Sequence, residues 1–224
     1  MKSGAIFDMD GLLFDTERFY RRAWLEVAPR FGQHPSPALA EAVCGTSGDH
    51  LKEIVRSYYP GVDADAYIRA MFRRVEELLA EKGAKLMPGA RELIAYLRVH
   101  GVKLAVASAS PRSMIERNLV AGGIRAEFDV IVSGSDISNG KPAPDIFLAA
   151  AAELGLSPEN CYVFEDGVNG ALGGVAAGCT TVMIPDLEKP TPTLLQGCTG
   201  IYNSLWDALE AIKATQLQCV KTYL

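Results

Sequence analysis

Strand-like and helix-like segments alternate along the second half of the chain, and this alternation constrains the fold more than any other feature. Short apolar runs predict strands at residues 103–108, 128–132, 162–164 and 180–184. The segments between them predict helices at residues 90–99, 111–119, 144–154 and 168–177. Alternation of this kind produces right-handed βαβ units. We therefore expect an α/β fold, with a Rossmann-like parallel sheet covered by helices on both faces.

A further strand candidate, residues 4–9, stands apart from this alternation. Helical spacing of apolar residues follows it and predicts helices near residues 16–31, 38–43, 50–58 and 64–82. A lone strand is not stable, so residues 4–9 must join the later sheet. We expect residues 16–84 to form an all-helical cap domain inserted into a catalytic core of residues 1–15 and 85–224, with the two crossings acting as paired hinges.

Composition and charge exclude several classes of protein. Of the 224 residues, 49% are hydrophobic, which is enough for a sizeable core and rules out a wholly disordered chain. The net charge is −5, whereas nucleic acids and anionic membranes attract basic surfaces. Residues 16–84 hold ten basic and ten acidic residues, so the acid surplus lies in the remainder. We expect no nucleic-acid partner and no membrane partner.

The N-terminal residues and the cysteines predict the compartment. The first apolar run is too short for a signal peptide, and no run approaches the ~18 apolar residues of a membrane span. The five cysteines form no Cys-x-x-Cys pair and are interpreted as small buried side chains or stray thiols. They are Cys44, Cys161, Cys179, Cys198 and Cys219. We expect a cytoplasmic protein and a monomer.

Polar residues follow each predicted strand, where ligands bind in open parallel sheets. They are Asp8, Asp10, Ser108, Lys141, Glu165 and Asp166. Two carboxylates ~4 Å apart repel by on the order of 4 kcal/mol at an effective dielectric near 20, so this cluster favours a cation. All-oxygen ligands favour Mg²⁺. Lys141 and the donors near Ser108 would then hold an anionic group that shares the metal, and this combination indicates phosphate.

Each of these residues also has a structural interpretation, since acids and serines commonly end strands and cap helices. Their joint occurrence, each after a strand, favours the functional interpretation. Other phosphate and hydrolase motifs fail: residues 134–141 have the wrong glycine spacing for a P-loop, and Pro142 follows where Ser or Thr is required. The histidines His34, His50 and His100 are scattered and are interpreted as surface residues.

In the segments that carry Asp8, Ser108, Lys141 and Asp166, the chain resembles the haloacid dehalogenase superfamily, in the branch with a helical cap after the first strand. The four motifs correspond to residues 8–16, 106–108, 140–142 and 164–166, in that order along the chain. The stretches at residues 141–147 and 165–170 resemble the β-phosphoglucomutase-like and sugar-phosphatase group. The resemblance spans nearly the whole chain.

The resemblance implies a mechanism of covalent catalysis. Asp8 would be the nucleophile that forms an aspartyl-phosphate, and Asp10 would be the general acid and base. Ser108 and Lys141 would stabilise the transferring phosphoryl group. Asp10 also distinguishes phosphate-transferring members from dehalogenases, which generally lack an acid at that position.

The resemblance also implies the metal ligands. Mg²⁺ would be bound by Asp8, the backbone carbonyl of Asp10 and Asp166, with Glu165 either a direct ligand or one layer further out. Substrate would be bound by Thr16, Tyr20, Gly45, Ser108, Ala109 and Lys141.

The reaction is interpreted as hydrolysis of a small phosphorylated metabolite, such as a sugar phosphate. The alternative is a sugar-phosphate mutase. β-Phosphoglucomutases typically carry a His where this chain has Tyr20, and a cap Arg that residues 45–50 lack. A non-catalytic phosphometabolite-binding module is a third alternative, although binding alone needs neither a nucleophile nor an acid.

Overall fold

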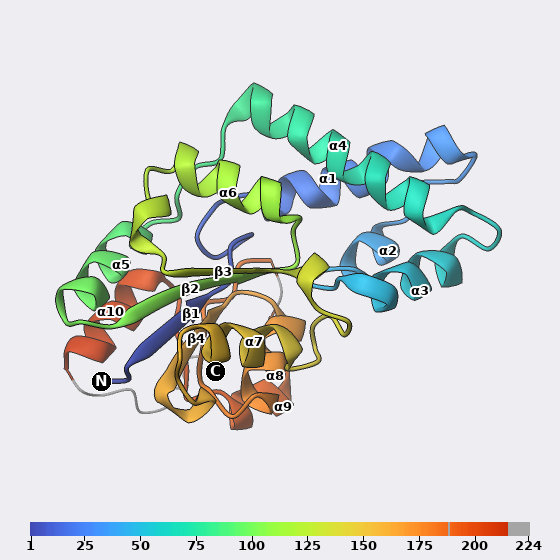
Figure 1. The fold of residues 1–224 in the computed structure, drawn as a ribbon. Coiled ribbons are helices and arrows are strands. Elements are labelled where there is room, and N and C mark those ends of the chain that lie inside the picture. The colour runs from blue at the N-terminus through green and yellow to red at the C-terminus, as the bar shows by residue number, and fades with distance from the viewer. Residues whose placement is uncertain (188, 215–224) are drawn as a thin grey trace.

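A six-stranded parallel sheet forms the centre of the protein (Figure 1). The computed structural model describes residues 1–187 and 189–214. The strand order is β3-β2-β1-β4-β5-β6. The strands are β1 Gly4–Phe7, β2 Lys103–Ser108, β3 Val130–Ser133, β4 Cys161–Glu165, β5 Thr180–Met183 and β6 Gly200–Ile201. The predicted α/β class is confirmed.

Helices cover both faces of this sheet, because successive side chains of each strand point to opposite faces. Ala5 and Phe7 contribute to one hydrophobic cluster, whereas Ile6 contributes to another. The first cluster includes residues of α5 (Ala90–Val99), α6 (Arg112–Ala121) and α10 (Leu205–Lys213). The second includes residues of α7 (Asp145–Glu153), and a third cluster joins α8 (Val168–Ala176) to α9 (Pro192–Gly197).

The C-terminal part of the fold was not foreseen from the sequence. The apolar pattern predicted five strands, but β6 adds a sixth at the edge of the sheet, followed by α10. A two-residue strand leaves almost no periodicity to detect. Elsewhere the observed bounds differ from the predicted ones by a few residues. Single-turn 3-10 helices connect several elements, at Ala28–Phe31, Arg125–Glu127, Gly134–Asp136 and Pro158–Asn160.

Four helices between β1 and α5 form the inserted cap. They are α1 Glu17–Val27, α2 Pro37–Ala42, α3 Gly48–Tyr58 and α4 Ala64–Lys82. Residues 16–84, all of them described, contain no strand. Their buried side chains form a separate hydrophobic cluster, in which Trp24 stacks on Tyr67, and Met114 of α6 also packs against it. Figure 1 shows α1 and α4 lying beyond one edge of the sheet, beside α6.

The two crossings between core and cap lie side by side. Phe14 and Leu86 form an antiparallel bridge, and the Asp15 amide donates to the carbonyl of Lys85 at 2.9 Å. The chain therefore enters and leaves the cap through a paired two-stranded connection.

The structure also shows where the histidines and the cysteines lie. The three histidines are exposed. Cys161 and Cys198 are buried, Cys44 and Cys179 are half-buried, and Cys219 lies outside the described residues. In the described part of the chain, no helix combines the length and the apolarity needed to cross a membrane.

Candidate active site

The candidate site lies where the strand order reverses. From β1 the chain proceeds to β2 and β3 on one side and then returns to place β4 on the other side of β1. The loops that follow β1 and β4 therefore diverge and leave a crevice at the carboxyl edge of the sheet. Asp8 follows β1 directly, and its amide donates to the Phe164 carbonyl of β4 at 3.0 Å. Glu165 is the last residue of β4, and Asp166 follows it.

Three carboxylates and one ammonium group meet at this crevice. Oxygens of Asp8, Glu165 and Asp166 lie within 4.8 Å of one another, and all three residues are buried. The Lys141 Nζ contacts Asp8 and donates to Glu165 Oε1 at 2.5 Å and to the Ala107 carbonyl at 3.2 Å. Lys141 is 1% exposed, so its charge is neutralised within the site rather than by water.

Two glycines provide the room that these carboxylates occupy. Gly11 has φ +87°, and a Cβ at this position would overlap the carboxylate of Asp166. A Cβ on Gly170 of α8 would likewise overlap the carboxylate of Glu165. At these two glycines the backbone therefore approaches the carboxylates of Asp166 and Glu165 more closely than it could at a residue with a Cβ.

Burial and mutual repulsion change the acidity of these groups. Burial, followed by the charge of Asp8, raises the pKa of Glu165 to about 8. The same two causes raise the pKa of Asp166 well above its usual range. Burial alone would lower the pKa of Lys141, but the carboxylates of Asp8 and Glu165 more than offset this and raise it. A cation bound among these acids would relieve the repulsion.

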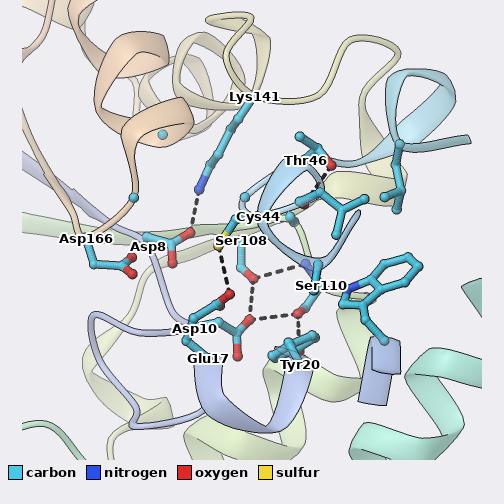
Figure 2. A pocket seen from close by; sticks show the side chains of 18 of the residues that line it. Asp8, Asp10, Glu17, Tyr20, Cys44, Thr46, Ser108, Ser110, Lys141 and Asp166 are labelled. Carbon is cyan, nitrogen blue, oxygen red and sulfur yellow. Dashed lines mark hydrogen bonds and ion pairs between the residues drawn. The ribbon is translucent and has the colours of Figure 1, made fainter. Parts of the chain in front are cut away.

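Hydroxyl groups surround the carboxylate of Asp10 (Figure 2). Thr16 Oγ1 donates to Asp10 Oδ1 at 2.7 Å. Ser110 Oγ and Ser108 Oγ donate to Asp10 Oδ2 at 2.7 and 3.2 Å. The Tyr20 hydroxyl lies 2.6 Å from Ser110 Oγ, so a chain of hydrogen-bonding groups runs from helix α1 to Asp10. Burial, together with Asp8, raises the pKa of Asp10 to about 6 although these donors oppose the change.

These groups open into a cavity between core and cap. The cavity encloses about 660 Å³ that protein atoms do not occupy, including its mouth. Its cap wall consists mainly of apolar and aromatic side chains from all four cap helices and the connection between α2 and α3. These residues are Glu17, Tyr20, Trp24, Ala40, Val43, Cys44, Gly45, Thr46, Leu51, Met71 and Phe72.

Comparison with known proteins identifies the family. A sequence model described as haloacid dehalogenase-like hydrolase matches residues 3–178. The chain belongs to this family. A probable pseudouridine-5'-phosphatase of Drosophila melanogaster is 36% identical over 218 residues, which cover 94% of this chain and 91% of that protein. Hexitol phosphatase B of Escherichia coli K12 is 33% identical over 189 residues, covering 82% of this chain and 84% of that protein.

A solved structure agrees with this assignment. CbbY from Rhodobacter sphaeroides in complex with phosphate superposes with a TM-score of 0.77 and 28% identity, covering 92% of this chain and 95% of that chain. The predicted haloacid dehalogenase fold with a helical cap is confirmed, and so is the prediction of a hydrolase of the phosphatase kind.

Most of the predicted site residues of this haloacid dehalogenase-like hydrolase lie around the one cavity. The predicted site residues that line it are Asp8, Asp10, Tyr20, Gly45, Ser108, Ala109, Lys141, Glu165 and Asp166. Thr16 does not line it: this residue is fully buried and its hydroxyl donates to Asp10. The carboxylate of Asp10 faces the hydroxyl groups, whereas those of Asp8, Glu165 and Asp166 face one another.

Three other cap residues near the predicted site residues lie in different surroundings. Arg18 forms an ion pair with Asp15 at 2.5 Å and lines a separate groove beside the connection between core and cap. Ser47 lies outside the cavity. It packs so closely against Gly134 and Gly140 that neither glycine has room for a Cβ. Thr46 lines the cavity beside Gly45.

Sequence reasoning missed two residues of the site, Glu17 and Ser110. Ser110 sits two positions after Ser108, and this spacing after a strand was the available signal. Glu17 begins helix α1, is 8% exposed, and accepts a hydrogen bond from Cys44 Sγ at 2.8 Å. No strand end marks Glu17, so only the packing of the cap on the core places it at the cavity.

Proposed function

We propose that this protein is a Mg²⁺-dependent phosphatase that hydrolyses a small phosphorylated metabolite through an aspartyl-phosphate on Asp8. The single observation that carries the proposal is the buried arrangement at the carboxyl edge of the sheet. There a carboxylate nucleophile, a second carboxylate held by hydroxyl donors, and an ammonium group line one cavity. These are the groups that a two-step phosphoryl transfer requires.

In the first step, a carboxylate oxygen of Asp8 attacks phosphorus and the bond between phosphorus and the leaving oxygen breaks. Asp10 gives its proton to that oxygen, and the alcohol departs. In the second step, Asp10 takes a proton from water while the water oxygen attacks phosphorus. The bond to Asp8 breaks, which releases phosphate, restores the carboxylate of Asp8 and leaves Asp10 protonated as it was at the start. The pKa of about 6 for Asp10 suits a group that must both give and accept a proton.

The remaining core residues support these steps. Lys141 offers an ammonium group beside Asp8, where negative charge accumulates on the phosphoryl oxygens. Ser108 and Thr16 hold the carboxylate of Asp10 in one orientation. Ser110 adds a third hydroxyl and joins this set to Tyr20 of the cap.

The acids beside Asp8 suit a hard divalent cation. Asp8, Glu165 and Asp166 offer only oxygen, and burial, together with the charge of Asp8, raises the pKa of Glu165 and of Asp166. We propose that Asp8 and Asp166 hold Mg²⁺ together with the Asp10 carbonyl. Glu165 would stand beside the ion and also pair with Lys141. When bound, the ion supplies positive charge that allows a phosphate dianion to approach Asp8.

The size of the substrate follows from the cavity and from the relatives. The cavity is bounded by the core on one side and the cap on the other, an enclosure that suits a small molecule. The relatives carry names of phosphatases, one for hexitols and one for pseudouridine-5'-phosphate. Both names describe small phosphorylated metabolites, and we propose a substrate of this class here.

A mutase and a binding module are less well supported. A mutase must hold a second phosphate, and Lys141 is the one cation among the described residues that line the cavity. Tyr20 stands where the mutase His would be, and its hydroxyl contacts Ser110 and Met114. A pure binding module would not need Asp10 enclosed by three hydroxyl donors.

We also propose that residues 16–84 move as one cap over a core of residues 1–15 and 85–224. The separate hydrophobic cluster of the cap and the paired connection at Phe14 and Leu86 support this division. Closure would shield the phosphoryl group from bulk water.

The decisive experiment replaces the nucleophile. Asp8→Asn keeps the size of the side chain but removes its negative charge. We expect hydrolysis of p-nitrophenyl phosphate with Mg²⁺ to fall by ~10⁴-fold or more. Asp49→Asn is the matched control, because Asp49 is an exposed cap residue that pairs with Lys52.

Three further results would decide the matter. Removal of divalent ions with EDTA should abolish turnover, and Mg²⁺ should restore it. Full activity of Asp8→Asn would exclude the aspartyl-phosphate mechanism. Conversion of β-glucose 1-phosphate to glucose 6-phosphate, in the presence of the bisphosphate, would establish the mutase instead.

A further inference from the structure

We propose that Ser47 of the cap is a positioning residue for the reaction. It seats in a notch of the core, and this contact holds the backbone from which Lys141 reaches the phosphoryl group. Ser47 does not line the cavity, so it acts through the core rather than on the substrate. This inference rests on the proposed phosphatase function and adds a link between closure of the cap and the ammonium group of the site.

Two glycines of the core form the notch. Gly134 follows strand β3 directly, and Gly140 directly precedes Lys141. A Cβ on Gly134 would lie 2.7 Å from the Cβ of Ser47 and 2.8 Å from its Oγ. A Cβ on Gly140 would lie 2.6 Å from the carbonyl oxygen of Ser47 and 2.6 Å from its Oγ. Neither glycine could therefore carry a side chain while Ser47 stays in place.

Backbone contacts hold the same cap segment against the core on both sides of Ser47. After it, Gly48 forms an antiparallel bridge with Asn139 of the core, and Figure 1 shows α3 beside the segment that follows β3. Before it, the carbonyl of Cys44 accepts a hydrogen bond from Asn169 Nδ2 of the core at 3.0 Å. The connection between α2 and α3 is therefore held at both of its ends.

This contact lies one residue from the reacting groups on each side. On the cap side, Thr46 lines the cavity directly before Ser47. On the core side, Lys141 follows Gly140, and its Nζ contacts the proposed nucleophile Asp8. Displacing Ser47 would release the backbone from which the Lys141 side chain begins. A misplacement of about 1 Å can reduce the rate of a reaction by about 100-fold, so a seat this close to Lys141 matters for turnover.

The fit of Ser47 depends on its size rather than on its hydroxyl. Ser47 precedes α3 as the N-cap residue, but its side chain makes no capping hydrogen bond. Its backbone is extended, with φ −152° and ψ 179°, and the residue is buried. Alanine should therefore seat as serine does. Valine also suits an extended backbone, but its branched side chain is larger than the space between the two glycines.

The test is a double-mutant cycle between Ser47 and Lys141, with p-nitrophenyl phosphate and Mg²⁺. In Ser47→Val we expect kcat to fall by about tenfold. In a Lys141→Met background the same replacement should change the residual kcat by less than about twofold, because the group that Ser47 positions is already absent. Ser47→Ala should keep kcat within about twofold of the wild type, because its side chain still fits the notch. Gly140→Ala fills the notch from the core side and should reproduce the loss in Ser47→Val, also where Ser47→Val does not fold.

Ser57→Val is the matched control, since it makes the same replacement at an exposed position of α3, and kcat should stay at its wild-type value. Equal losses from Ser47→Val with Lys141 and with methionine at that position would overturn the inference. Hydrogen exchange gives a measurement that needs no turnover: amides of residues 45–50 should exchange at least about fivefold faster in Ser47→Val than in the wild type. Unchanged exchange would also overturn the inference. Absence of turnover by the wild type would instead contradict the phosphatase function, and the exchange measurement would still test the contact.

Discussion

The two walls of the cavity differ in their chemistry. The core wall carries four carboxylates, an ammonium group and two serine hydroxyls. The serines bond to Asp10, whereas Lys141 bonds to Asp8 and Glu165. The cap wall is mainly aromatic and aliphatic, and most of its side chains also belong to the hydrophobic cluster of the cap. Among the described residues of this wall, Glu17 carries the one acidic side chain.

This difference separates the reaction from the choice of substrate. A change in the core wall alters a network whose members determine one another's charge and orientation, so it should affect every substrate alike. A change in the cap wall alters the shape and polarity met by the leaving group, so its effect should depend on the substrate. The predictions below test this separation, beginning with the largest effect.

Of the changes that test this separation, Gly11→Ala in the core should have the largest effect. The added Cβ overlaps the carboxylate of Asp166 and displaces it from the acid cluster. We expect the Mg²⁺ concentration for half-maximal activity to rise by about 10–100-fold, as for other changes that displace a metal ligand. A Mg²⁺ titration of phosphatase activity measures this shift.

Gly61→Ala is a matched control for this variant. Gly61 has a similar φ of +84°, and a Cβ there meets nothing within 4 Å. Both variants therefore place alanine in a left-handed conformation, which costs about 1–2 kcal/mol. If both variants shifted the Mg²⁺ requirement equally, backbone strain rather than the displaced carboxylate would be the cause.

The same contrast explains what the sequence could predict. Asp8, Lys141 and Asp166 were identified because each follows a strand, and parallel strands bring their carboxyl ends to one edge. Glu17 has no such marker: its place depends on how α1 packs against the Cys44 segment, a tertiary contact between distant parts of the chain. The core residues of the site can therefore be predicted from the sequence, whereas the composition of the cap wall cannot.

The C-terminal elements were missed for two different reasons. Strand β6 has two residues and owes its place to pairing with β5, where the Tyr202 amide donates to the carbonyl of Met183 at 2.9 Å. Helix α10 does carry a helical spacing of apolar residues, with Leu205, Leu209 and Ile212 buried. That helix could have been predicted from its periodicity, but the edge strand could not.

An effect of intermediate size is expected for the change of stability with pH when divalent ions are absent. The pKa of Asp10 is raised to about 6 and that of Glu165 to about 8, from values near 4 in an unfolded chain. Between pH ~4 and these values, the folded protein keeps protons that the unfolded chain has released, so stability falls as pH rises. We expect the metal-free protein to have a melting temperature several degrees lower at pH 8 than at pH 5.5.

Added Mg²⁺ should reverse this trend, because the ion replaces the protons at the acids. Thermal unfolding at both pH values, with EDTA and with Mg²⁺, measures the effect, and the gain from Mg²⁺ should be larger at pH 8. Higher stability of the metal-free protein at pH 8 would contradict the assignment of these buried acids as a repulsive cluster.

The smallest effect is expected for Tyr20→Phe, at a hydrogen-bonded link between the walls. The variant removes the hydroxyl that lies 2.6 Å from Ser110 Oγ but keeps the ring that packs edge-on against Phe72. Thr16 and Ser108 still hold Asp10, so kcat should fall only about two- to fivefold, with KM little changed. Because Tyr20 acts through Asp10, the loss should be the same for p-nitrophenyl phosphate and for glucitol 6-phosphate. A loss confined to one of the two esters would place Tyr20 in substrate selection and move the boundary between the two walls.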